Sequence, residues 1–441
     1  MKVLKFGGTS VGSAQRMKDV AKLITDGEQK IVVLSAMSGT TNTLVEISDY
    51  LYKKNPEGAN EIINRLEAKY KQHIDELYST EEYKQKTLDF VKSVFDYIRS
   101  YTKDIFTLFE EKVILAQGEI ISTNMVTNYL CEQGVNATLI PALEYMRTDK
   151  NSEPDLTYIR EKLPAQLEAN PGYEIYITQG FICRNAYGEI DNLQRGGSDY
   201  TASLIGAAIN ASEIQIWTDI DGMHDNDPRV VDKTSPVRQL HFEEAAELAY
   251  FGAKILHPTC IQPAKYANIP VRLLNTMEPT APGTLISNDT EKGKIKAVAA
   301  KDNITAIKIK SSRMLLAHGF LRKVFEIFES YQTPIDMVCT SEVGVSMSID
   351  NTKHLNEIVN DLKKYGTVTV DHDMCIVCVV GDLEWENVGF EAKALDAMRE
   401  IPVRMISFGG SNYNISFLIR ESDKKQALQS LSNVLFNGKE K

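Results

Sequence analysis

The chain has 441 residues, of which 43% are hydrophobic and 25% are charged, a balance that is ordinary for a soluble globular protein of two or three domains. Its net charge is −11, and it has no basic cluster of the kind that binds nucleic acid. No apolar run approaches the ~20 residues of a membrane span, and the N-terminus lacks the apolar segment of a signal peptide. With six scattered cysteines, these features predict a cytoplasmic protein without a nucleic-acid or membrane partner.

The first twelve residues predict a strand, a tight glycine turn and a helix. Strand-forming residues at 3–6 stop at Gly7 and Gly8, and apolar residues at helical spacing follow. Glycines allow backbone N–H groups to approach a bulky anion, and a helix N-terminus adds positive potential there. Lys5, at the strand end, is placed to reach the same anion; an ordinary turn with a solvated lysine is the alternative. The turn is not a P-loop, because Ser13 stands where that motif needs lysine.

Two further stretches offer groups that suit a small ligand. The second predicted strand, residues 31–36, is followed by small and hydroxyl residues at 37–43. These suit either a small anion at a helix start or an ordinary helix cap. Residues 60–126 keep a helical period, and Glu119 falls in a mostly apolar part of it, where its neighbours favour a pocket.

A second glycine-rich turn follows the strand that is predicted at residues 175–182. Residues 193–202 contain Arg195, which could clamp a carboxylate or phosphate with two hydrogen bonds. They also contain Asp199, which could orient lysines or groups bound to Mg²⁺. The alternative is that Ser198 or Asp199 simply caps the helix that begins there.

The next predicted strand, residues 214–219, opens into a polar loop at residues 220–229. The acidic spacing of this loop does not fit a calcium loop, because its glycine is misplaced and no glutamate closes it. A polar loop at the carboxyl end of a strand is instead where open α/β sheets bind ligands. Lys254 could be a second phosphate-binding lysine, and residues 271–274 are predicted to form the last strand of this domain.

Residues 279–294 are rich in turn-forming residues and mark a domain boundary, beyond which the sequence contains an internal repeat. In each copy a Gly-Phe pair, at residues 319–320 and 389–390, opens a helix, and further strands and a helix complete an α+β module. A duplicated module after a catalytic-looking domain suggests small-molecule sensing. A purely structural dimerisation module is the alternative.

Five motifs, taken together and in order, resemble those of the aspartokinases in the amino-acid kinase superfamily: residues 5–10, 195–202, 217–219, 227–229 and 251–258. The resemblance covers nearly the whole chain. It implies a three-layer α/β/α kinase domain with a largely parallel sheet over residues 1–285, followed by two ferredoxin-like ACT domains. The first ACT domain, residues 304–373, would be inserted into the second, which would comprise residues 295–303 plus 374–441. The resemblance also implies a homodimer that forms through the ACT domains.

The function that this resemblance implies is transfer of the γ-phosphoryl group of ATP, with Mg²⁺, to the β-carboxylate of L-aspartate, the first step toward lysine, threonine and methionine. Lys5 and Asp199 would be catalytic, with Asp199 acting on Mg²⁺ directly or through water. ATP would be held by Lys5, Phe6, Gly7, Gly8, Thr218, Asp219, His224, Arg229, Lys254 and Ile255, and aspartate by Thr41, Glu119 and Arg195. Many relatives carry Tyr where this chain has His224, so the contact of this residue with the nucleotide departs from the family pattern.

The first ACT copy also resembles that of lysine-sensitive aspartokinases, which predicts feedback inhibition by lysine at a dimer interface. The effector residues would be Met314, Ala317, Phe320, Leu321, Ile335, Asp336, Thr340, Ser341 and Glu342. Two carboxylates, Asp336 and Glu342, suit a dibasic amino acid better than threonine; solvated edge residues are the alternative. Ala317 stands where a lysine-sensitive relative has Ser.

Three other functions compete with this prediction. Another kinase of the same superfamily, acting on acetylglutamate, glutamate or a nucleotide, is less consistent with the paired ACT-like repeats. A bifunctional kinase with a homoserine dehydrogenase would need a second dinucleotide domain. A catalytically dead amino-acid sensor is opposed by the presence of Lys5, Arg195 and Asp199 together.

Overall fold

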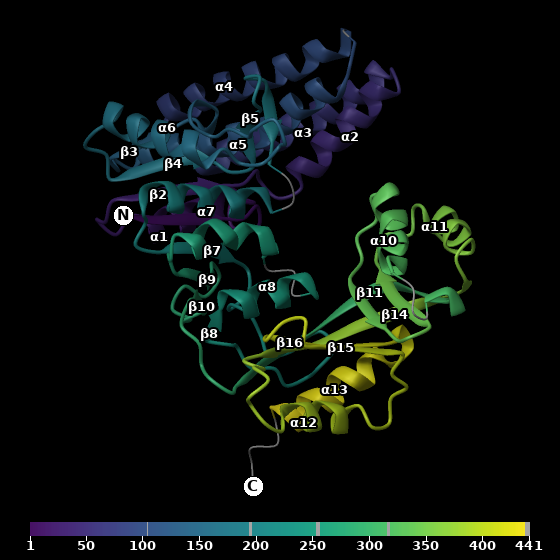
Figure 1. The fold of residues 1–441 in the computed structure, drawn as a ribbon. Helices are drawn as coiled ribbons and strands as arrows, with labels where there is room; N and C mark the ends of the chain where they lie inside the picture. Colours follow the sequence, from purple (N-terminus) through teal and green to yellow (C-terminus); the bar gives the residue numbers. More distant parts are fainter. Residues whose placement is uncertain (104, 194–195, 253–255, 315–317, 437–441) are drawn as a thin grey trace. The chain divides into compact units, whose positions relative to one another are not determined.

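The computed structural model describes residues 1–103, 105–193, 196–252, 256–314 and 318–436 (Figure 1). Contacts divide the chain into two compact units. One comprises Met1–Met223 and Ile255–Asn288, and the other comprises His224–Lys254 and Asp289–Lys441.

The first unit is built on a twisted sheet whose neighbouring strands are parallel, with one exception. Its strands run in the order β3-β4-β2-β1-β7-β9-β10, and only β10 is antiparallel to its neighbour. Their bounds are β1 Lys2–Phe6, β2 Lys30–Leu34, β3 Ala137–Leu139, β4 Ile175–Gln179, β7 Ile214–Thr218, β9 Val271–Asn275 and β10 Thr284–Ser287. All five residues of both β2 and β4 are buried, as expected for parallel strands that are covered on both faces.

Helices cover both faces of this sheet. Alternate strand residues, such as Leu4 and Phe6 of β1 and Val32 and Leu34 of β2, pack against five helices in one core. These helices are α1 Ala14–Ile24, α2 Thr40–Tyr52, α3 Pro56–Leu77, α4 Glu81–Ser100 and α5 Leu108–Glu132. The other layer contains α7, which contacts β1, β2 and β7, with α6 and α9 packed beside it. Their bounds are α6 Leu156–Ala169, α7 Gly197–Ile209 and α9 Gln262–Tyr266, and short 3₁₀ turns occupy Tyr101–Lys103, Ala142–Glu144 and Pro258–Ile261.

Two sequence-based expectations for this unit are wrong. The strand predicted at residues 175–182 ends at Gln179, because the chain turns at Gly180 and Phe181 and then forms β5 (Ile182–Arg184), which pairs with β6 (Ile190–Asn192). Residues 271–274 are not in the last strand of the domain, since β10 follows within the segment taken as a boundary. The turn-forming residues on both sides of β10 concealed this short strand, three residues of which pair with β9.

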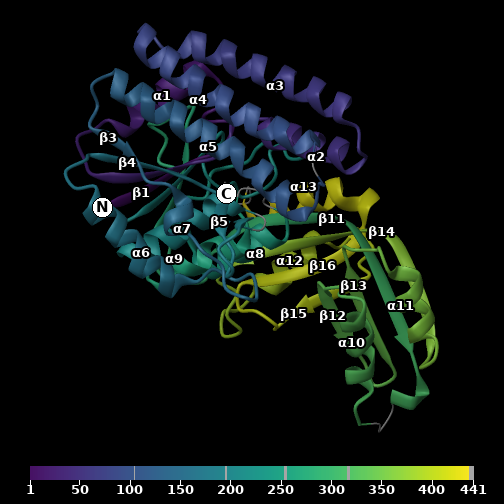
Figure 2. The same ribbon diagram turned by 90° about the horizontal axis from the view of Figure 1, so that it is seen from above.

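The second unit contains an antiparallel sheet with strand order β12-β13-β11-β14-β16-β15 (Figure 2). The strands are β11 Ile295–Lys310, β12 Met337–Thr340, β13 Gly344–Ile349, β14 Thr367–Gly381, β15 Met405–Phe408 and β16 Asn414–Arg420. The other elements of this unit are β8 Gln239–His241, α8 Phe242–Tyr250, α10 Phe320–Ser330, α11 Leu355–Leu362, α12 Phe390–Ala397 and α13 Lys424–Leu435, with 3₁₀ turns at Ser312–Met314 and Glu421–Asp423. The predicted helix starts are confirmed, because left-handed Gly319 (φ 80°) and Gly389 (φ 90°) cap α10 and α12.

The two long strands β11 and β14 run side by side through both copies of the repeat. One half of this strand pair contributes Ile307 and Ile309 to a core with α10 and α11, and the other half contributes Val377 and Val379 to a core with α12 and α13. The register shifts between Lys301 and Ala306, where the two halves meet. The predicted fold class, an α/β domain with a largely parallel sheet followed by two α+β modules, is therefore confirmed.

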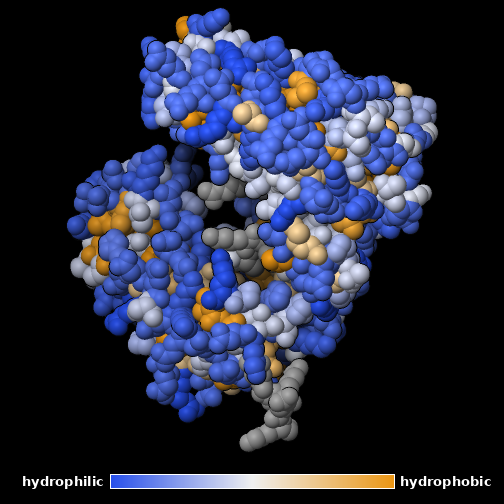
Figure 3. All heavy atoms as spheres, turned by 180° about the vertical axis from the view of Figure 1, so that it is seen from behind, coloured by the Kyte–Doolittle hydropathy of each residue, from blue (hydrophilic) through white to orange (hydrophobic). Residues whose placement is uncertain are grey.

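The surface of the chain is mostly hydrophilic on the face drawn in Figure 3, with small and separate apolar patches. In the part of the chain that the structure describes, no helix combines the length and the apolar character needed to cross a membrane.

Candidate active site

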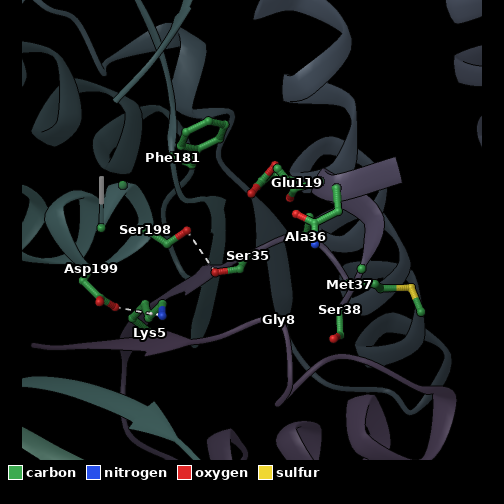
Figure 4. A pocket seen from close by; sticks show the side chains of 15 residues that line it. Lys5, Gly8, Ser35, Ala36, Met37, Ser38, Glu119, Phe181, Ser198 and Asp199 are labelled. Carbon is green, nitrogen blue, oxygen red and sulfur yellow. Dashed lines mark hydrogen bonds and ion pairs between the residues drawn. The ribbon is translucent and has the colours of Figure 1, made fainter. Parts of the chain in front are cut away.

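The carboxyl ends of β1, β2 and β4 and the first turns of α2 and α7 surround a cavity of about 380 Å³ (Figure 4). This edge of an open parallel sheet is the usual place for a ligand, and the two helix starts direct N–H groups toward it. The cavity is lined by Lys5, Gly8, Ser35, Ala36, Met37, Ser38, Gly39, Thr41, Asn42, Glu119, Phe181, Gly196, Gly197, Ser198 and Asp199.

The glycine turn after β1 lies directly against the turn after β2. A Cβ on Gly8 would lie 2.8 Å from the carbonyl oxygen of Ala36, and the Ser38 N–H donates to the Gly8 carbonyl over 3.1 Å. The N–H of Gly7 points at the carbonyl of Trp217 at 3.4 Å, and the Phe6 ring is buried and stacked on the Trp217 ring. Only backbone atoms of Phe6 can therefore face a ligand. Of the two glycines in this turn, Gly8 lines the cavity.

Lys5 and Asp199 form an ion pair inside the cavity. The Nζ of Lys5 lies 2.8 Å from Oδ1 of Asp199, and the two side chains are 12% and 13% exposed. Asp199 occupies the first turn of α7, where the positive end of the helix dipole stabilises a carboxylate. The pair thus holds an ammonium group at the floor of the cavity, at a position where it can meet an incoming anion (Figure 4).

Glu119, from the middle of α5, brings a second carboxyl group to the cavity. Its side chain is 3% exposed, and burial raises its pKa from 4.5 to about 8, although an N–H of Ala36 opposes the shift. Among the described residues, Oε2 has no hydrogen-bond partner. The close approach of α5 is possible because residue 118 is glycine, whose Cβ would lie 2.8 Å from that of Ala36. A buried carboxyl group with a free oxygen is stabilised by a bound cation, so this wall of the cavity suits an ammonium group.

Two residues in the cavity are not identified by the sequence motifs. Ser35 donates a hydrogen bond from its hydroxyl to that of Ser198 over 2.9 Å, which ties the end of β2 to the start of α7. Phe181 lies at φ 68°, in the left-handed region that a bulky residue rarely adopts, and its N–H donates to the hydroxyl of Thr201 over 3.0 Å. In the sequence, Gly180 before Phe181 was the available signal for a turn. Phe181 itself lines the cavity (Figure 4).

The structure brings Lys5, Gly8, Thr41, Glu119 and Asp199 together in one cavity. Three predicted residues, Arg195, Lys254 and Ile255, lie outside the described part of the chain.

The other predicted nucleotide residues fall in both units. Thr218 ends β7, the parallel neighbour of β1, and Asp219 follows it and is exposed. His224 and Arg229 belong to the second unit. There His224 Nδ1 lies 3.0 Å from the Thr234 hydroxyl, and the exposed Arg229 makes two hydrogen bonds to Asp227.

The predicted effector residues that the structure describes lie in two groups, one around the start of α10 and one in and beside β12. Asp336 precedes the strand and its side chain is only 2% exposed, whereas Glu342 follows the strand and is exposed. Thr340 and Ser341 line a cavity of about 530 Å³ together with Lys308 and Arg404. Of the others, Phe320 is buried, Leu321 is 37% exposed, Met314 and Ile335 are half-buried, and Ala317 lies outside the described residues.

The two acidic groups therefore do not converge within one chain. Five residues lie between them, four of which form β12, and at about 3.3 Å per residue this strand spans roughly 13 Å. One small amino acid cannot reach both carboxylates of the same subunit.

Comparison with known proteins agrees with this geometry. Residues 1–275 match the amino acid kinase family, and residues 377–435 match an ACT domain. Because the first match covers more than half of the chain, the chain belongs to the amino acid kinase family.

The relatives that it matches over nearly its whole length are aspartokinases, which confirms the predicted resemblance. Aspartokinase 1, chloroplastic, of Arabidopsis thaliana is 35% identical over 98% of this chain and 80% of that protein. Lysine-sensitive aspartokinase 3 of Escherichia coli is 32% identical over 98% of this chain and 99% of that protein. The crystal structure of E. coli aspartokinase III in complex with aspartate and ADP has a TM-score of 0.85 at 31% identity, covering 99% of this chain and all of that one.

Proposed function

We propose that this chain is an ATP-dependent aspartate kinase, which transfers the γ-phosphoryl group of ATP to the β-carboxylate of L-aspartate and yields 4-phospho-L-aspartate. The observation that carries the proposal is the single cavity that contains the Lys5–Asp199 ion pair and the buried Glu119. Such a site offers one cation for phosphate oxygens and one anion for an ammonium group, as a zwitterionic acceptor requires.

The chemistry that this site must perform is mainly alignment and charge neutralisation. The β-carboxylate oxygen of aspartate forms a bond to the γ-phosphorus while the bond from that phosphorus to the bridging oxygen of ADP breaks. Both reactants are anions, so the ammonium of Lys5 and the N–H groups at the start of α7 lower the repulsion between them. Asp199 keeps the Lys5 ammonium in place until the phosphate arrives.

Mg²⁺ would neutralise the phosphate charge, as it does in kinases generally. It is usually bound by one or two carboxylates together with substrate phosphates, and Asp199 can supply such a carboxylate at the cavity floor. Among the described residues, no group of three possible ligands could hold a metal by itself, which suits an ion that arrives with the nucleotide.

The remaining assignments follow the family pattern. Thr41 and Arg195 hold the carboxylates of aspartate, and Glu119 holds its ammonium. Phe6, Gly7, Gly8, Thr218, Asp219, His224, Arg229, Lys254 and Ile255 serve ATP together with Lys5. The kinase domain in this proposal comprises residues 1–285. We also propose that the enzyme is cytoplasmic.

In this proposal the two ACT copies regulate the enzyme. Residues 304–373 form the inserted copy, and residues 295–303 with 374–441 form the other. Lysine, to which the E. coli relative is named as sensitive, inhibits the enzyme through the inserted copy. Because Asp336 and Glu342 lie at opposite ends of β12, an effector that uses both takes one from each subunit. This supports a homodimer that forms through the ACT domains.

The test of the proposed activity is release of ADP in a coupled assay with aspartate, glutamate and N-acetylglutamate run in parallel at pH 7.5. We expect turnover that depends on aspartate and exceeds that with either analogue by at least about tenfold, because a site with fixed charges discriminates strongly by position. Equal turnover with glutamate, or none with aspartate, would overturn the assignment.

The regulatory proposal predicts the behaviour of Asp336→Asn, which removes a charge while retaining shape. The lysine concentration for half-maximal inhibition should rise by about tenfold or more, the scale of one hydrogen bond to a charged group. It is measured as a ratio to the wild-type value at matched aspartate. Glu357→Gln, on the exposed surface of α11, is the control and should leave that concentration unchanged. A wild-type enzyme that responds to threonine but not to lysine would contradict the choice of effector.

A further inference from the structure

Asp336, the carboxylate proposed for the effector's ammonium, already has two donors from its own chain. Its Oδ1 accepts a hydrogen bond from the Tyr250 hydroxyl at 2.6 Å and lies 2.8 Å from the ammonium of Lys301. Its Oδ2 has no hydrogen-bond partner among the described residues, although the side chain is only 2% exposed. An effector's ammonium group that approaches this carboxylate therefore meets an ammonium group that is already bound there.

Lys301 has an alternative partner close by. Its Nζ lies 2.9 Å from Oδ2 of Asp350, whose side chain is 39% exposed at the end of β13. The same ammonium lies over the Tyr250 ring, 4.3 Å from the ring centroid. Lys301 can thus leave Asp336 and remain paired with Asp350, so the ammonium of Lys301 is not left buried without a partner.

Tyr250 connects this cluster to a functionally important stretch of the chain. It is the last residue of α8, and burial together with Asp336 raises the pKa of its hydroxyl, which stays protonated and donates. Two residues later, Gly252 adopts φ 122°, and a Cβ there would lie 2.1 Å from the carbonyl oxygen of Ala300. The segment after α8 therefore rests on β11 beside Lys301, and the chain continues directly into Lys254 and Ile255, which are assigned to ATP by the family pattern.

We propose that Lys301 is an internal competitor for the effector's ammonium at Asp336, and that Tyr250 transmits the exchange of partners to the end of α8. The inference rests on the proposed inhibition by lysine and deepens it. Two ammonium groups at one buried carboxylate repel each other strongly, so the effector displaces Lys301 toward Asp350. Tyr250 senses the exchange because it donates to the same oxygen, and an effector inhibits only through such a difference between two states.

The decisive experiment compares two substitutions with opposite expected effects. Lys301→Met removes the competitor, so the lysine concentration for half-maximal inhibition should fall by about fivefold or more. Asp350→Asn removes the alternative partner, so Lys301 is held at Asp336 and that concentration should rise by a similar factor. Lys301→Arg keeps the charge and should stay near the wild-type value. Turnover without lysine should be unchanged in all three, since none of these residues touches a substrate.

Transmission is tested with Tyr250→Phe, which removes only the hydroxyl. Isothermal titration should show that lysine binds as tightly as to the wild type or more tightly, while the maximal inhibition falls. Tyr52→Phe, whose hydroxyl bonds to Glu111 in the other unit, is the matched control and should keep full inhibition.

The outcomes separate this inference from the proposal on which it rests. If the wild type is inhibited by lysine but Lys301→Met and Asp350→Asn leave the half-inhibitory concentration unchanged, the competition is refuted and lysine regulation stands. Full inhibition of Tyr250→Phe refutes transmission through the hydroxyl. A wild-type enzyme that ignores lysine overturns both.

Discussion

Lys5→Ala is expected to lower kcat by about 10²–10³, the usual loss when one preorganised donor to the transition state is removed. The ammonium of Lys5 is held at the cavity floor by Asp199 at 2.8 Å and is the cation on β1 that faces the cavity. The KM for ATP should change less than kcat, because the interaction between the Lys5 ammonium and the phosphate oxygens is stronger in the transition state than in bound ATP. Steady-state kinetics with both substrates varied would measure the two effects.

Lys2→Ala is the matched control for this prediction. Lys2 lies on the same strand, but it is 38% exposed and pairs with the exposed Glu28. Its removal should leave kcat within about twofold of the wild type, as expected for a surface ion pair. A folded Lys5→Ala enzyme whose kcat equals that of Lys2→Ala would remove Lys5 from the mechanism.

Glu119→Gln is expected to raise the KM for aspartate by about 10-fold to 100-fold, because the substrate ammonium loses a charged partner. Binding of that ammonium favours the ionised form of Glu119, whose pKa is raised to about 8 by burial. The wild-type KM for aspartate should therefore fall as pH rises from 6 to 8, whereas the KM of the variant should lose this dependence. Glu61→Gln, on the exposed face of α3, should behave as the wild type. An unchanged KM in Glu119→Gln would exclude the assignment.

The same carboxyl group predicts how stability varies with pH. In the folded protein Glu119 keeps its proton up to pH 8 or so, whereas in the unfolded chain it loses the proton near its ordinary value of 4.5. The folded state thus binds more protons between these values, and the free energy of unfolding falls as pH rises through this window. Urea unfolding without substrate at pH 5 and pH 8 should show this fall in the free energy of unfolding for the wild type and not for Glu119→Gln. Equal pH dependence in both proteins would contradict the raised pKa.

The parallel strands of the first unit could be predicted because they are buried on both faces. The continuous apolar run at residues 31–34 of β2, which ends at Ser35, needs no tertiary information to be recognised. The break between β4 and β5 could not be predicted in the same way. Phe181 adopts a positive φ because its N–H bonds to Thr201 and its ring packs on Gly197, and both partners are distant in sequence.

The candidate site, too, could be predicted from the sequence only in part. Lys5 and Asp199 each lie in a glycine-rich motif, so their type and position were visible in the sequence, and Glu119 was marked by its apolar surroundings. Their convergence depends on the order of β1, β2 and β4 in the sheet, and the bond between Ser35 and Ser198 depends on the packing of α7. In the second unit the motif singled out Asp336 as a candidate effector residue, but its partners Lys301 and Tyr250 come from other elements of the fold and could not be predicted from that motif.

The long paired strands β11 and β14 have a consequence for how this protein can be cut and rejoined. Lys301 of β11 faces Ile376 of β14 across the ladder, and Ile304 faces Met374. From these rungs the ladder continues to Lys310 and Thr367, so the whole of the other repeat is connected between two residues that face each other. A short turn that joined Lys301 to Ile376 would excise one repeat in a single deletion and leave an ordinary hairpin within the other.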